Sequence, residues 1–268
     1  MTKQNQAPAL ASAEDVQRLE NVFADTSATP RTRAWMLQKA ALGVAAAGLA
    51  GVAAGCGGSS RKTTSTAAST MSHGDTIKSV IDTAITAEAL AVTYLSAVIK
   101  ATKPSDKTGP FVSVLKAANS AEYDHYKALQ SLGAKPLTLK FWAPNAFFGP
   151  KLSGVFPTLE VAETLFVNAY LIGTTVFAKA GKADFARYAG EIGGVEAEHL
   201  ALARAAQQKI PNDLGFMDYS IDSMDGIVKA LESAGVGFGK QGSKPGTFVH
   251  FTAPTSDVLT PVSNGGPA

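Results

Sequence analysis

Hydrophobic residues recur at steps of three and four in four segments between residues 74 and 210, a spacing that gathers them on one face of an α-helix. This pattern predicts helices over residues 75–101, 110–132, 157–180 and 183–210. Residues that commonly end helices follow the predicted ends: Pro104, Gly133, Gly181 and Pro211. No segment of this region alternates convincingly between polar and apolar residues, so we predict no β-strand there.

The second and third predicted helices are separated by a connection of about 23 residues, 134–156. This connection is too long for a tight turn and is rich in aromatic residues, which are Phe141, Trp142, Phe147 and Phe148. Such a crossover lets the third helix run parallel to the second while the connection packs against the bundle. The predicted fold over residues 73–211 is therefore all-α, a four-helix bundle with one long crossover.

Acidic residues interrupt the apolar face of each predicted helix, and two of the helices also carry histidine. The six residues are Glu88, Glu122, His125, Glu163, Glu196 and His199. In the second and fourth helices the histidine follows the glutamate by three positions, which places both on one face and lets both reach one cation. Carboxylate and imidazole ligands together suit iron or manganese. We therefore predict that these six residues form a metal site for iron or manganese.

Burial of these side chains has an energetic consequence. Four ionised carboxylates in a dry bundle core would cost many kcal/mol unless they were neutralised. Two divalent cations would cancel that charge. There are three alternatives to metal binding: the carboxylates are protonated and hydrogen-bonded, the core contains more water than assumed, or the site is a metal-free remnant.

An internal repeat supports the same grouping. The sequence AEALAV around Glu88 aligns with AETLFV around Glu163, and EYDH at 122–125 aligns with EAEH at 196–199. A repeated helix pair places equivalent side chains at equivalent heights about a pseudo-two-fold axis.

These motifs resemble those of the ferritin-like superfamily, whose di-iron and di-manganese members carry this set of four glutamates and two histidines on four helices. Together with the N-terminal pattern described below, residues 74–210 look like the exported bacterial ferritin-like proteins related to plant desiccation-associated ones. The resemblance implies terminal ligands Glu88 and His125 for one ion, terminal ligands Glu163 and His199 for the other, and bridging ligands Glu122 and Glu196.

Several branches of that superfamily are excluded by single residues. The chain has one cysteine, so it has no Cys-x-x-Cys electron-transfer module, no internal disulfide and no cysteine-based cluster. Tyr123 stands where bacterioferritin-type proteins carry a haem-ligating methionine, and Leu129 stands where ribonucleotide reductase carries its radical-forming tyrosine. A net charge of +2 excludes a polybasic nucleic-acid-binding protein.

The first 55 residues predict an export signal. Arg31 and Arg33, separated by Thr32, precede an uncharged run over residues 40–55 that would rise about 24 Å as a helix, short of the roughly 30 Å of a membrane core. The run is typical of a signal peptide, and the choice between twin-arginine and general secretion stays open. Cys56 follows in AAGC, which looks like a bacterial lipobox with alanine in place of the usual leucine, and we predict that Cys56 is lipidated.

Beyond the signal, residues 56–72 are rich in Gly, Ser and Thr and predict a flexible tether. The protein would then lie on the periplasmic or extracellular face of the cell envelope, anchored to the membrane by lipid. Residues 212–268 form an extension with one predicted short helix at 222–235 and one extended piece at 246–251. We expect this extension to wrap over the bundle or to offer a partner surface.

Other residues near the motifs are expected to have structural roles. Glu160 is more typical of a solvated or supporting group than of a ligand, and Asp124 and Glu198 should point away from the site. Tyr94 and Tyr170 are expected to pack in the core. His73 and His250 lack nearby acids and should be solvated or structural, and the pair Gly193–Gly194 indicates either a close approach by another element or a kink.

Two classes of function follow. The first is an exported protein whose di-iron centre reacts with O2 or peroxide, as a ferroxidase or a peroxide scavenger, with a di-manganese, catalase-like protein as a variant. The second is a non-enzymatic envelope protein that keeps the bundle for binding or for stress protection. Either class is compatible with a homodimer.

Overall fold

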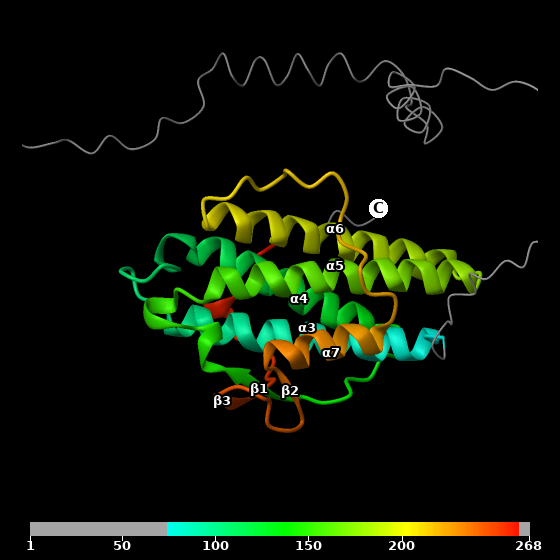
Figure 1. Ribbon diagram of the computed structural model, residues 1–268, viewed down its shortest axis with the longest axis horizontal. Coiled ribbons are helices and arrows are strands. Elements are labelled where there is room, and N and C mark those ends of the chain that lie inside the picture. Colours follow the sequence, from blue (N-terminus) through cyan, green and yellow to red (C-terminus); the bar gives the residue numbers. More distant parts are fainter. Residues whose placement is uncertain (1–73, 263–268) are drawn as a thin grey trace, which may run out of the picture. The chain divides into compact units, whose positions relative to one another are not determined.

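The computed structural model describes residues 74–262. The predicted export signal, the lipidation site Cys56, the tether and His73 lie outside the described residues. Within them the chain is mostly helical, with five α-helices, four short 3-10 helices and one three-stranded sheet (Figure 1). The prediction of a helical fold is confirmed.

The four predicted helices are α3 (Ile77–Ala101), α4 (Val112–Ser131), α5 (Val155–Lys179) and α6 (Ala183–Ala206). Helix α3 packs against α4 and α5 packs against α6, while contacts between α3 and α5 and between α4 and α6 join the two pairs into one bundle. Helices α4 and α5 run in the same direction, as the predicted crossover requires (Figure 1).

Local sequence explains where most of these helices begin and end. Thr76 caps α3 through its side chain, which accepts a hydrogen bond from the Ser79 amide. Gly133 and Gly181 follow α4 and α5 with left-handed φ angles of 86° and 69°. Helix α6 ends at Ala206, not at residue 210 as predicted, because Gln208 turns the chain with a φ of 62°.

The crossover between α4 and α5 contains a short strand, which contradicts the prediction that no β-strand lies between residues 74 and 210. Strand β1 (Lys140–Pro144) is the centre of the sheet and pairs antiparallel with β2 (Gly237–Phe238) on one side and β3 (Gly246–His250) on the other. Its partners lie about a hundred residues further along the chain, so no local pattern announces the pairing. Phe141 is fully buried between this sheet and the bundle.

The C-terminal extension wraps over the bundle, one of the two arrangements predicted for it. Helix α7 (Met224–Ala234) packs on α3 and α5, and it buries Met224, Ile227 and Leu231. Further on, the Asn119 side chain of α4 donates a 3.0 Å hydrogen bond to the Val258 carbonyl. The extension is therefore part of the same hydrophobic core.

Helices α3 and α5 are long and apolar enough, by length and composition, to cross a membrane. In this structure they lie against each other inside the bundle, and each carries a buried glutamate. Their apolar composition is that of core helices.

Candidate metal centre

The bundle brings all six predicted residues together. Helix α3 contributes Glu88, α5 contributes Glu163, and α4 and α6 each contribute a glutamate and, three positions later, a histidine. All four glutamates are buried: Glu88, Glu122 and Glu196 are 0% exposed. The two histidine side chains are about one-tenth exposed, so they too are almost completely shielded from solvent.

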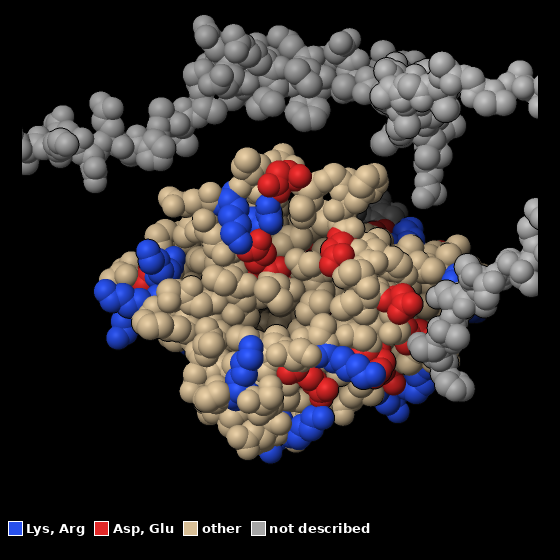
Figure 2. Space-filling view, in the orientation of Figure 1, with Lys and Arg blue, Asp and Glu red and all other residues tan. Residues whose placement is uncertain are grey.

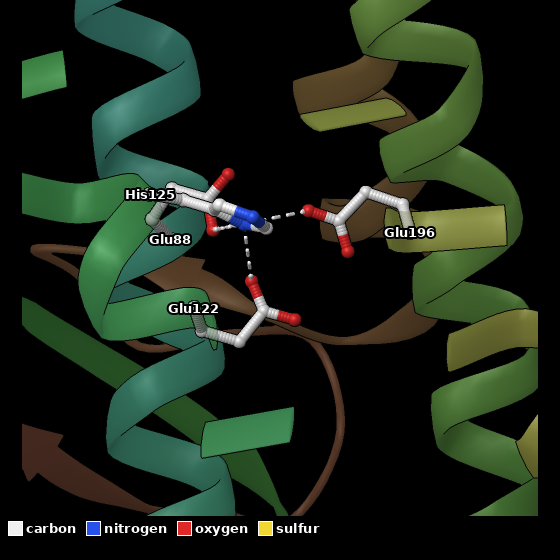
Figure 3. A group of neighbouring side chains, drawn as sticks. All are labelled: Glu88, Glu122, His125 and Glu196. Atoms are coloured by element: carbon white, nitrogen blue, oxygen red, sulfur yellow. Dashed lines mark ion pairs between the residues drawn. The ribbon is translucent and has the colours of Figure 1, made fainter. Parts of the chain in front are cut away.

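The first group of four surrounds His125 (Figure 3). Its Nδ1 atom lies 3.2 Å from Oε1 of Glu196, 3.5 Å from Oε2 of Glu122 and 3.7 Å from Oε2 of Glu88. Carboxylates from three helices thus point toward one imidazole nitrogen.

The second group of four surrounds His199. Its Nδ1 atom lies 3.0 Å from Oε1 of Glu122 and 3.2 Å from Oε2 of Glu196. Glu163 completes the group, and in each group the candidate ligand atoms all lie within 4.8 Å of one another.

Glu122 and Glu196 belong to both groups. In each of them one carboxylate oxygen faces His125 and the other faces His199. A carboxylate with its two oxygens aimed at neighbouring positions is arranged as a bridge between two ions. The other four residues, Glu88, His125, Glu163 and His199, each belong to one group only.

Burial and neighbouring charges shift the pKa values of three of the four glutamates. Burial, followed by the charges of Glu122 and Glu196, holds the pKa of Glu88 and the pKa of Glu163 well above the usual value. Burial would also raise the pKa of Glu122, but the two histidines at ion-pair distance outweigh burial and hold that pKa well below its usual value.

The pKa values of both histidines are shifted in the direction that favours the charged imidazolium form. Burial alone would lower the pKa of His125 and of His199, but the surrounding carboxylates raise both pKa values well above normal. The directions of these pKa shifts favour bound protons on two of the carboxyls and on both imidazoles, which lowers the negative charge buried in the cluster.

Hydrogen bonds do not satisfy this cluster. Among the described residues, five buried carboxylate oxygens lack a hydrogen-bond partner: Oε2 of Glu88, both oxygens of Glu122, Oε2 of Glu163 and Oε1 of Glu196. His125 Nδ1 is also unpartnered, although three carboxylates lie within ion-pair distance, because the orientations do not suit direct hydrogen bonds. Unpartnered buried oxygens are costly, and they are the atoms that would coordinate cations. The donor set fits two divalent ions, whose four positive charges match four carboxylates.

Tyr170, which was expected only to pack in the core, also contacts the cluster. Its hydroxyl donates a hydrogen bond to Oε1 of Glu88, across the bundle from α5 to α3. Tyr170 follows Glu163 by seven positions, two helical turns along the same face, and this spacing is the signal that could have identified it.

The other candidates have structural roles, as expected. The Tyr94 hydroxyl donates to the Phe147 carbonyl at 2.6 Å, and Glu160 pairs with Arg204 and Lys209. Asp124 pairs with Lys127, and both Glu198 and His250 are exposed.

The expected close approach occurs at Gly193. A Cβ atom there would lie 3.1 Å from Cβ of Tyr170, whereas one at Gly194 would have no neighbour within 4 Å. Gly193 therefore lets α6 approach α5 beside the cluster.

Comparison with known proteins adds no relative: no protein-family model, no curated protein and no solved structure matches this chain. The geometry of the site therefore carries the functional argument.

Proposed function

We propose that this chain is an exported ferritin-like protein that binds two divalent metal ions, iron in the first place, and reacts with O2 or peroxide. The observation that carries the proposal is the pair of buried four-residue groups that share Glu122 and Glu196. Each shared carboxylate directs one oxygen to each group, an arrangement with no evident purpose for a single cation.

The protein's own groups would have distinct tasks. Glu122 and Glu196 would hold both ions together, while Glu88 with His125 and Glu163 with His199 would hold one ion each. The Tyr170 hydroxyl fixes the orientation of Glu88 through its hydrogen bond. Glu88 and Glu163, whose raised pKa values favour the protonated form, would give up their protons as metal enters. Bound iron would supply one-electron chemistry toward O2 or peroxide.

The location we propose for the protein rests on its N-terminal sequence. A signal peptide followed by a lipidated Cys56 would attach the bundle, through the tether at 56–72, to the outer face of a bacterial membrane. Partners would then be metal ions, an oxidant and the lipid surface.

Metal content and oxygen consumption test this function together. Purified metal-free protein is incubated with Fe(II) without oxygen, desalted and analysed for iron per chain; air is then admitted and oxygen uptake is recorded. We expect about two irons per chain and oxygen uptake that follows iron content. A protein that retains no iron overturns the metal site, and one that retains iron but consumes neither O2 nor added peroxide overturns the oxidant chemistry.

Variants separate the site from adventitious binding. Glu163→Gln should lower the iron content, while Glu198→Gln, two residues past Glu196 and exposed, should leave it unchanged. Metal analysis of protein taken from its native envelope decides between iron and manganese, because metal loading in a foreign host follows availability.

A further inference from the structure

A cavity of about 320 Å³ lies between α3, α5, α7 and the sheet, and Glu163 of the metal cluster forms part of its wall. Much of the wall is apolar, as its residues on α3, α5 and the crossover show: Ala91, Ala97, Phe147, Leu159, Ala162 and Phe166. The volume falls in the range of small-molecule sites, and it is roughly twice that of an apolar cavity of about 150 Å³ that accommodates benzene.

Most polar groups in this wall are already used by the protein. The Thr93 hydroxyl donates to the Ala89 carbonyl at 2.6 Å, and the Tyr94 hydroxyl donates to the Phe147 carbonyl at 2.6 Å. The Trp142 indole N–H donates to the Lys244 carbonyl at 2.8 Å. Water in the cavity would therefore find few hydrogen-bond partners, and an apolar molecule would replace it favourably.

Two charged residues lie at different places in the cavity wall. Of the residues that line it, only Glu163 and Lys244 are charged. Glu163 is buried and one of its oxygens is unpartnered, whereas Lys244 is exposed, on the loop between β2 and β3. Among the described residues, the Lys244 ammonium has no acidic partner within 4 Å.

The surroundings are consistent with an apolar entrance. On the face of the molecule that looks toward the viewer, uncharged residues cover the middle, over α5, and charged side chains lie around them (Figure 2). Val161 of α5, which also lines the cavity, is 53% exposed.

We infer that this cavity binds a medium-chain organic acid, with its apolar chain inside, its free end beside Glu163 and its carboxylate paired with Lys244. The inference deepens the proposed function, since it names the class of substrate that the metal centre would face. The role as substrate rests on that function, but binding itself does not require metal.

Calorimetric titration of metal-free full-length protein with decanoic acid, and separately with 1-decanol, tests the binding. Both probes should bind. Ala162→Phe fills the cavity from α5 and should weaken both at least tenfold, while Ala178→Phe, exposed on the same helix, should change neither. Lys244→Met should weaken decanoic acid about threefold and leave decanol unchanged, as expected for an exposed ion pair.

Orientation is tested in protein loaded with Mn(II). Its unpaired electrons should speed proton relaxation of the terminal methyl group of decanoic acid more than that of the methylene next to the carboxylate. Faster relaxation at the carboxylate end overturns the orientation. Absence of binding by both probes, or equal binding by Ala162→Phe, overturns the cavity as a ligand site.

The two proposals fail separately. Decanoic acid binding by a protein that retains no metal would leave the cavity site standing and remove the metal function. Full metal loading of a protein that binds neither decanoic acid nor decanol would leave the metal function standing and remove the cavity as a ligand site.

Discussion

Glu122 and Glu196 differ from the other two glutamates in what their oxygens face. Each has one oxygen near His125 and one near His199, while Glu88 and Glu163 each belong to a single group. Loss of a shared ligand should therefore disturb both positions, and loss of a terminal ligand only one.

Replacement by glutamine tests this difference. Glu88→Gln should retain about one of two metal ions per chain, and Glu122→Gln should retain less than one, as measured by metal analysis after desalting. Because burial raises the pKa of Glu88 well above its usual value and so favours the neutral carboxyl, the neutral amide should leave the melting temperature of metal-free protein nearly unchanged. Equal metal loss in the two variants would contradict the distinction between shared and terminal ligands.

The single hydrogen bond from the Tyr170 hydroxyl to Glu88 should contribute to the stability of the metal-free protein. Tyr170→Phe leaves Oε1 of Glu88 without its buried donor, so the metal-free protein should lose about 1–3 kcal/mol of unfolding free energy in urea denaturation. Tyr188→Phe, on the more exposed part of α6, is the matched control and should change stability by less than about 0.5 kcal/mol.

At the scale of secondary-structure elements, the contact between α5 and α6 sets how closely these two helices approach each other beside the cluster. Helix α6 approaches α5 where Gly193 lies against Tyr170, one turn before Glu196. The adjacent Gly194 has no such neighbour, so the pair forms a natural comparison within one helix.

Alanine should be tolerated less well at Gly193 than at Gly194. Gly194→Ala should raise stability by up to about 1 kcal/mol, because alanine favours helix. Gly193→Ala places a methyl group 3.1 Å from the Tyr170 Cβ atom and must push α6 away from α5, so it should be less stable than Gly194→Ala and bind metal more weakly. Thermal melts and metal titrations of both variants check this; equal behaviour would show that the helix contact does not position the site.

At the scale of the whole molecule, protons and bound metal ions would both offset the negative charge buried in the cluster, but their binding would respond oppositely to pH. In metal-free protein the pKa values of His125 and His199 are raised above 6.5, and those of Glu88 and Glu163 above 4.5. Stabilisation from groups with raised pKa values is complete below their unfolded values and is lost as pH rises through the folded ones. Glu122, whose pKa is lowered, behaves in the opposite way and loses its contribution as pH falls below 4.5.

Metal-free protein should therefore become less stable as pH rises above about 6.5, whereas metal binding strengthens because its ligands must be deprotonated. The increase in melting temperature on adding Mn(II) should be larger near about pH 8 than near about pH 6, by differential scanning calorimetry of wild type. The Glu122→Gln variant should show little increase at either pH. If the increase in melting temperature on adding Mn(II) became smaller with rising pH in the wild type, the proposed competition between protons and metal ions would be wrong.

Local spacing was sufficient to place four helices and to select six residues on their inner faces, because residues three, four and seven apart share a face in any α-helix. It also showed the repeat of the two helix pairs and the glycines that end α4 and α5. Only the folded chain brought Tyr170 to Glu88, turned the oxygens of Glu122 and Glu196 toward both histidines, and paired β1 with strands about a hundred residues away. Those arrangements depend on how distant helices and strands pack, and periodicity within one segment carries no information about which partner another segment will find.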